Sequence, residues 1–103
     1  MRVFSAVVFH YYEDATAERL AKTVYIAHAD TMDGLEADMQ KELQAYANWQ
    51  LRQAAAWAAP GVIENFCVSF NIHRFKHGNY HDTNTWDCYP NRQMQEKLVL
   101  PIT

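Results

Sequence analysis

The feature that most constrains the fold is a long helical pattern over residues 33–58 of the 103-residue chain. Asp33 with Glu36 forms a capping-box pattern that begins the helix, and Pro60–Gly61 ends it. Between these signals one apolar stripe recurs at spacings of three and four, with a single polar interruption. Its members are Leu35, Met39, Leu43, Tyr46, Ala47, Ala54 and Trp57. A helix with one apolar stripe needs a second layer to cover it, which predicts a helix facing a sheet.

Two apolar residues in the second half of this helix, Trp49 and Leu51, lie off the stripe. They widen the apolar surface there. This pattern indicates a second contact surface on the C-terminal half of the helix.

Strand patterns flank the helix. Residues 3–12 are rich in β-branched and aromatic residues, and both alternate sets are mostly apolar, which predicts a central strand covered on both faces or packed at an interface. Residues 19–28 form a second strand, joined to the first as a hairpin. Residues 62–75 alternate between an apolar set (Phe66, Val68, Phe70, Ile72) and a mostly polar set (Cys67, Ser69, Asn71, His73), as expected of a half-buried antiparallel strand.

Residues 76–94 show no periodic pattern and are interpreted as a long loop. Residues 96–103 are predicted to form a short last strand, and Pro101 indicates an edge position or a strand end. The predicted fold is therefore one α+β domain over residues 1–103. Its elements run β-β-α-β-loop-β, with one long helix packed on one face of an antiparallel sheet.

Composition excludes several classes of protein. Half of the residues are hydrophobic, so a core can form. Residues 1–42 hold eight acidic and four basic residues, a net charge of −4, while the rest of the chain is close to neutral. No basic stripe favours nucleic-acid binding. The acidic half is interpreted as a solvated surface, with a face for a basic partner as the alternative.

No apolar run reaches the length of a membrane span, and residues 3–12 indicate a strand and not a secretory signal. We expect a soluble, cytoplasmic protein that has no contact with membranes. Cys67 and Cys88 are then expected to be reduced thiols.

Neither a metal site nor a catalytic site is predicted. The possible zinc ligands are Cys67, His73, His77, His81 and Cys88, but they lack the close paired spacings that a structural zinc site needs. His81 is next to Asp82, yet no nucleophile, phosphate-loop or metalloprotease motif is present. No metal and no cofactor is therefore expected, and the histidines of residues 76–94 are interpreted as surface groups.

The expected loop over residues 76–94 is the candidate site. It mixes aromatic, basic and small hydrogen-bonding residues, a composition typical of binding surfaces. Its candidate partner-binding residues are His77, Tyr80, His81, Trp86, Tyr89 and Arg92. The alternative is that its aromatic residues fold back as a lid on the sheet.

These observations predict a small non-enzymatic protein-interaction module. By analogy it fits the inhibitors with which phages and mobile elements bind and block a host protein. The two apolar faces of residues 3–12 and the aromatic content of 14% also predict a homodimer. The alternative function is a small-ligand or metal-dependent enzyme with its site between the sheet and residues 76–94.

Overall fold

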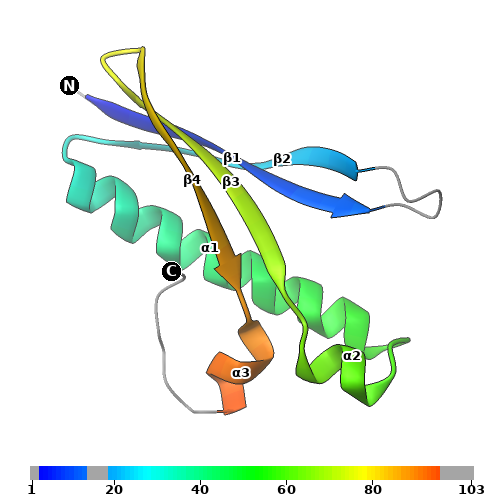
Figure 1. Ribbon diagram of the computed structural model, residues 1–103. Coiled ribbons are helices and arrows are strands. Elements are labelled where there is room, and N and C mark those ends of the chain that lie inside the picture. Colours follow the sequence, from blue (N-terminus) through cyan, green and yellow to red (C-terminus); the bar gives the residue numbers. More distant parts are fainter. Residues whose placement is uncertain (1–2, 14–18, 96–103) are drawn as a thin grey trace.

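The computed structural model describes residues 3–13 and 19–95. Four antiparallel strands form one sheet in the order β2-β1-β3-β4, and a long helix crosses one of its faces (Figure 1). The elements are β1 Phe4–Glu13, β2 Arg19–Ala29, α1 Met32–Ala55, α2 Pro60–Glu64, β3 Val68–Lys76, β4 Asn79–Cys88 and α3 Pro90–Gln95. The predicted two-layer α+β class with one long helix on an antiparallel sheet is confirmed.

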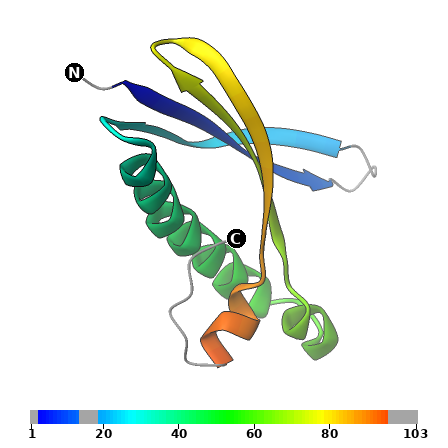
Figure 2. The same cartoon turned by 60° about the vertical axis from the view of Figure 1, so that its left-hand side comes forward.

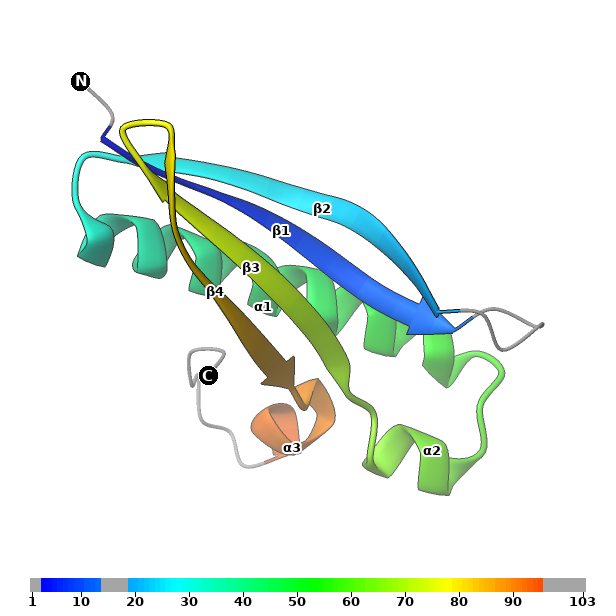
Figure 3. The same cartoon turned by 45° about the horizontal axis from the view of Figure 1, so that its top comes forward.

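The core lies between α1 and the two central strands. Alternate residues of β1 (Ala6, Val8) and of β3 (Val68, Phe70, Ile72) are fully buried, and they meet Leu35, Met39, Leu43 and Ala47 of α1. The alternation predicted for β3 and the central position of the first strand are confirmed. In the part of the chain that the structure describes, however, α1 covers one face of the sheet and no helix crosses the other (Figures 2 and 3).

The prediction of a loop over residues 76–94 is wrong. After β3, His77 and Gly78 form a two-residue turn, both with positive φ (51° and 78°), and β4 returns antiparallel to β3. Positive φ at both central residues is the requirement of the hairpin turn whose twist matches its strands. The short helix α3 then follows.

The sequence of β4 carries no strand pattern, because β4 is an edge strand with polar residues on both faces. Towards α1 it presents Asp82 and Asn84 before Trp86 and Cys88, and towards the other face it presents Thr83, Thr85 and Asp87. Backbone hydrogen bonds to β3 hold β4 in place. Such bonds do not require apolar side chains at alternate positions, so the sequence of β4 shows no apolar alternation.

The helix boundaries also differ from the prediction. Thr31, and not Asp33, is the N-cap, and its hydroxyl accepts a hydrogen bond of 3.0 Å from the Gly34 amide. Glu36 does not close a capping box, because its carboxylate pairs with Arg74.

α1 ends at Ala55, so Trp57 lies beyond it and is 78% exposed, while Leu51 is buried.

The third strand starts later than its sequence pattern predicts. Pro60 opens a second short helix, α2, so residues 60–64 are helical and β3 begins only at Val68. Proline is well placed at a first helical position, because its fixed φ is helical and its missing amide hydrogen would have no helical acceptor there. The strand predicted for residues 96–103 lies outside the described residues. None of the described helices is long and apolar enough to cross a membrane.

Candidate functional site: the open face of the sheet

The candidate site is the face of the sheet opposite α1, called here the open face. Side chains alternate along a strand, so the residues between the buried core positions point to this side. Cross-strand pairs then bring them together: Ile26 lies beside Val7, Val7 beside His73, and His73 beside Thr83. The open face is therefore one surface built by all four strands.

One half of the open face is apolar. Val7, Phe9 and Tyr11 follow one another along the middle of β1, and Ile26 extends this apolar row onto β2. Ile26 is 55% exposed, whereas the β1 side chains are shielded in part by their neighbours on both sides. The predicted cover on both faces of β1 is thus present only on the α1 side of the described structure, and the other apolar set is left at the surface.

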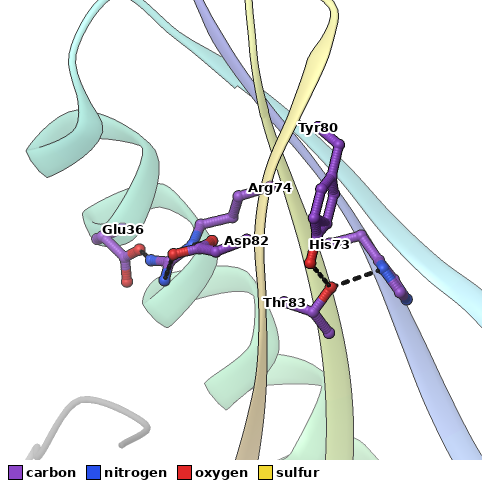
Figure 4. A network of polar contacts seen from close by, with 6 residues as sticks. All are labelled: Glu36, His73, Arg74, Tyr80, Asp82 and Thr83. Atoms are coloured by element: carbon purple, nitrogen blue, oxygen red, sulfur yellow. Dashed lines mark hydrogen bonds and ion pairs between the residues drawn. The ribbon is translucent and has the colours of Figure 1, made fainter.

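The other half, on β3 and β4, carries a row of hydrogen-bonding side chains. The Thr83 hydroxyl lies 3.1 Å from His73 Nδ1 and 3.0 Å from the Tyr80 hydroxyl (Figure 4). The rings of Phe9 and His73 pack edge to face. At the far end of the row, Ser69 donates a 2.7 Å hydrogen bond to Asp87. These contacts hold polar groups in place directly beside the apolar row.

Between the two rows the open face is hollowed. A depression of about 270 Å³ is lined by Tyr11, Ser69, Phe70, Asn71 and Thr85. The side-chain oxygen of Asn71 is buried and accepts no hydrogen bond from the described residues. A buried polar oxygen without a donor costs free energy, so the described residues leave part of the hydrogen-bonding capacity of Asn71 unused at this depression.

The opposite face of β3 and β4 is tied to α1 by charge (Figure 4). The Arg74 guanidinium donates to both carboxylate oxygens of Asp82, at 2.6 and 2.9 Å, and also pairs with Glu36 of α1. Burial disfavours the charge of Arg74, but the Asp82 hydrogen bonds and the two carboxylates outweigh it and raise the pKa of Arg74. The carboxylate of Asp82 is therefore engaged by Arg74 and ties β4 to β3.

The six residues predicted as one partner-binding site do not lie together. His77, Tyr80 and His81 are at the β3–β4 turn, where Tyr80 is 64% exposed. Tyr89 and Arg92 are at the other end of β4, where Arg92 lies 4.6 Å from the centre of the Tyr89 ring. Tyr80 and Tyr89 are nine positions apart along an extended chain, a distance of roughly 30 Å.

Trp86 differs from both groups. It lies on the α1 side of β4 and is half-buried against the core, whereas the sequence interpretation places it outside the core. Of the six residues, only Tyr80 takes part in the polar row of the open face described above. The two halves of this face had partial signals in the sequence: the doubly apolar β1 and the polar alternate set of β3.

The chemistry of the described side chains gives no metal centre, since no three His, Cys, Asp or Glu residues among them lie close enough to hold an ion. Cys67 is exposed and Cys88 is buried, and neither forms a disulfide. Burial, followed by the charge of Cys67, raises the pKa of the Cys88 thiol to about 12. The Cys88 thiol is therefore not a nucleophile at neutral pH.

Comparisons with protein-family models, with curated proteins and with solved structures found no match to this chain. No family therefore supplies a function for the open face.

Proposed function

We propose that the protein is a non-enzymatic interaction module whose open face binds the surface of another protein and occludes it. The observation that carries this proposal is the side-by-side arrangement of an apolar row and a row of fixed hydrogen-bonding groups. The apolar row (Val7, Phe9, Tyr11, Ile26) offers area to bury. The polar row, with His73, Thr83 and Tyr80, offers directional contacts.

The size of the open face supports a protein as its occupant. Ten-residue strands at roughly 3.3 Å per residue and four strands at about 4.8 Å give a flat area of about 600 Å². That is close to the roughly 800 Å² per partner of a standard protein interface. The mixture of polar and apolar groups is typical of complexes whose partners also exist apart, because permanent interfaces are more apolar.

The two edges of the sheet are less suited to binding by strand addition. The register of β1 with β2 shifts so that Val24 is an extra residue, and that of β3 with β4 shifts so that His81 is one. Such bulges interrupt the row of backbone groups that an added strand would pair with. We therefore assign binding to the face of the sheet and not to its edges.

The alternative function, an enzyme, requires a site between the sheet and residues 76–94. Residues 79–88 are themselves a strand of the sheet, hydrogen-bonded to β3 over their whole length. No space separates them from the sheet that they were expected to cover. The depression of about 270 Å³ on the open face has room for a side chain of a partner protein.

We further propose that the protein acts in the cytoplasm as an inhibitor of the host protein that it covers, as phage and mobile-element proteins of this size do. This part rests on the analogy drawn from size and the lack of catalytic motifs. Cys67 and Cys88 form no disulfide in the described structure, which is compatible with it.

The test is affinity capture from the native host with matched variants. We expect Ile26→Glu combined with Tyr80→Ala to lose a protein that the wild type retains, because both side chains are exposed on the open face. Trp57→Ser, which removes an even more exposed aromatic residue outside the sheet, should retain it. The captured protein is then assayed for loss of its own activity.

Two results would overturn the proposal. One is retention of the same protein by the double variant with its melting temperature unchanged. The other is that wild type and double variant capture no protein that the immobilised resin alone does not.

A further inference from the structure

A second pocket lies on the opposite side of the protein, between α1 and the edge strand β2. Its volume is about 290 Å³. One wall comes from α1, where Glu42, Tyr46 and Trp49 follow at spacings of four and three and so share a helix face. The other wall is Val24 and Tyr25 of β2, and Leu43 of the core also lines the pocket.

We infer that this pocket binds a basic side chain, arginine or lysine, of a partner protein. The inference rests on the proposed role in protein binding only for the source of that side chain. Aromatic rings attract a cation through their faces, and a carboxylate beside them supplies the opposite charge. The apolar stem of an arginine or lysine side chain matches the apolar lining below.

The aromatic walls are held in place before anything binds. The Tyr46 hydroxyl accepts a hydrogen bond of 2.9 Å from Gln50 and lies 2.7 Å from His10 Nδ1. On the other wall, Tyr25 donates a 2.5 Å hydrogen bond to Asp38. Walls that are already ordered lose little conformational entropy when a ligand enters.

The charge of the pocket is left unsatisfied. Glu36 is paired with Arg74, and Asp38 accepts the Tyr25 hydroxyl, but Glu42 has no hydrogen bond or ion pair with any described residue. The Trp49 ring, 6.2 Å from Tyr46 between centroids, is 48% exposed, so it is open to a ligand. This gives the acidic first half of the chain and the off-stripe Trp49 a common use.

The test titrates the intact protein with three small probes, N-acetyl-arginine amide, N-acetyl-lysine amide and N-acetyl-citrulline amide, and follows the tryptophan indole NMR signals. Citrulline matches arginine in shape but has no charge. We expect arginine or lysine to shift the Trp49 signal, citrulline to leave it unchanged, and added salt to weaken the effect. The stronger of the two basic probes identifies the preferred side chain.

Glu42→Gln should weaken binding of the basic probe about two- to fivefold, the range of an exposed ion pair. Glu64→Gln, which neutralises an exposed acid on α2, is the matched control and should not. Equal shifts with citrulline, full affinity in Glu42→Gln, or shifts at Trp57 in place of Trp49 would each overturn the inference. None of these results depends on the open face, so they are separable from a failure of the proposed function.

Discussion

The imidazole of His10 lies between the sheet and α1, in contact with the rings of Tyr46, Tyr12 and Phe70. Gln50 donates to the Tyr46 hydroxyl, which lies 2.7 Å from Nδ1 of His10. An unprotonated Nδ1 is the arrangement in which it can accept the hydroxyl proton of Tyr46. Burial, and after it the charge of Lys22, lowers the pKa of His10. The native packing therefore favours the neutral imidazole.

This predicts a loss of stability in mild acid. In the unfolded chain His10 takes up a proton near its ordinary pKa of about 6.5, whereas in the folded chain it does so only at lower pH. The stability that neutral His10 contributes is complete above the unfolded-state pKa of about 6.5. It declines as the pH falls from there towards the lowered pKa of the folded chain. Chemical denaturation at pH 7.5 and pH 5 should show a drop in the free energy of unfolding that is reduced in His10→Asn.

The matched control is His81→Asn, which removes an exposed imidazole at the β4 bulge. It should keep the pH dependence of the wild type. An equal drop between pH 7.5 and pH 5 in wild type and His10→Asn would contradict the assignment of neutral His10 to the native state.

β4 carries one aromatic residue on each side of the sheet, so packing and binding can be tested with separate variants. Trp86 packs against the core and Tyr80 is exposed at the other end of the strand. We expect Trp86→Ala to lower the free energy of unfolding by about 2–3 kcal/mol, somewhat less than a fully buried aromatic residue. Tyr80→Ala should change it by less than about 0.5 kcal/mol.

Urea denaturation of the two variants checks this prediction. Unchanged stability of Trp86→Ala would mean that Trp86 is a surface residue, as first interpreted from the sequence. A large loss in Tyr80→Ala would mean that the hydrogen bond to Thr83 is needed for the hairpin, and Tyr80 would then be a poor probe of binding.

The ion-pair network of Arg74 joins three elements: α1 through Glu36, β3 through its own backbone, and β4 through Asp82. Arg74→Met should cost about 2 kcal/mol of stability, because it leaves two partly buried carboxylates without a counter-charge. This lies above the roughly 0–1 kcal/mol of an exposed pair and below the loss of a fully buried one.

A double-mutant cycle tests whether the residues act together. Asp82→Asn should destabilise the wild type but cost little in the Arg74→Met background, where its charge is already unpaired. Additive effects of the two substitutions would show that the network does not couple β4 to the rest of the fold.

For the chain as a unit, the open face also predicts self-association, since Val7 and Phe9 of the apolar row lie at the middle of a sheet that no described helix covers on this side. Because polar groups fill half of the face, we expect a weak and reversible dimer. Sedimentation equilibrium should give a mass that rises above the monomer value of 12.0 kDa at high micromolar concentration.

Ile26→Glu places a charge on the same face and should return the mass to that of the monomer. Trp57→Ser should leave the association unchanged. A wild-type mass of 12.0 kDa at every concentration would contradict self-association, and the open face would then be left for a different protein.

Much of the fold follows from local patterns that the sequence carries by itself. The stripe of α1, the doubly apolar β1 and the alternation of β3 each record which side of an element is buried, because burial selects apolar residues with the period of the element. These three patterns predict the two layers. The apolar half of the candidate site was also detectable, since the second apolar set of β1 predicts a contact on the face of the sheet that α1 does not cover.

The tertiary structure alone decided the role of residues 76–94. β4 is placed by backbone hydrogen bonds to β3, and its two faces carry polar residues because one is open and the other meets Arg74. The sequence of such a strand does not alternate between apolar and polar residues, so its pattern does not predict a strand. Whether Tyr80 and Tyr89 share a surface depended on whether the chain between them is coiled or extended. The hairpin extends it, which separates the two residues and makes the open face a property of all four strands together.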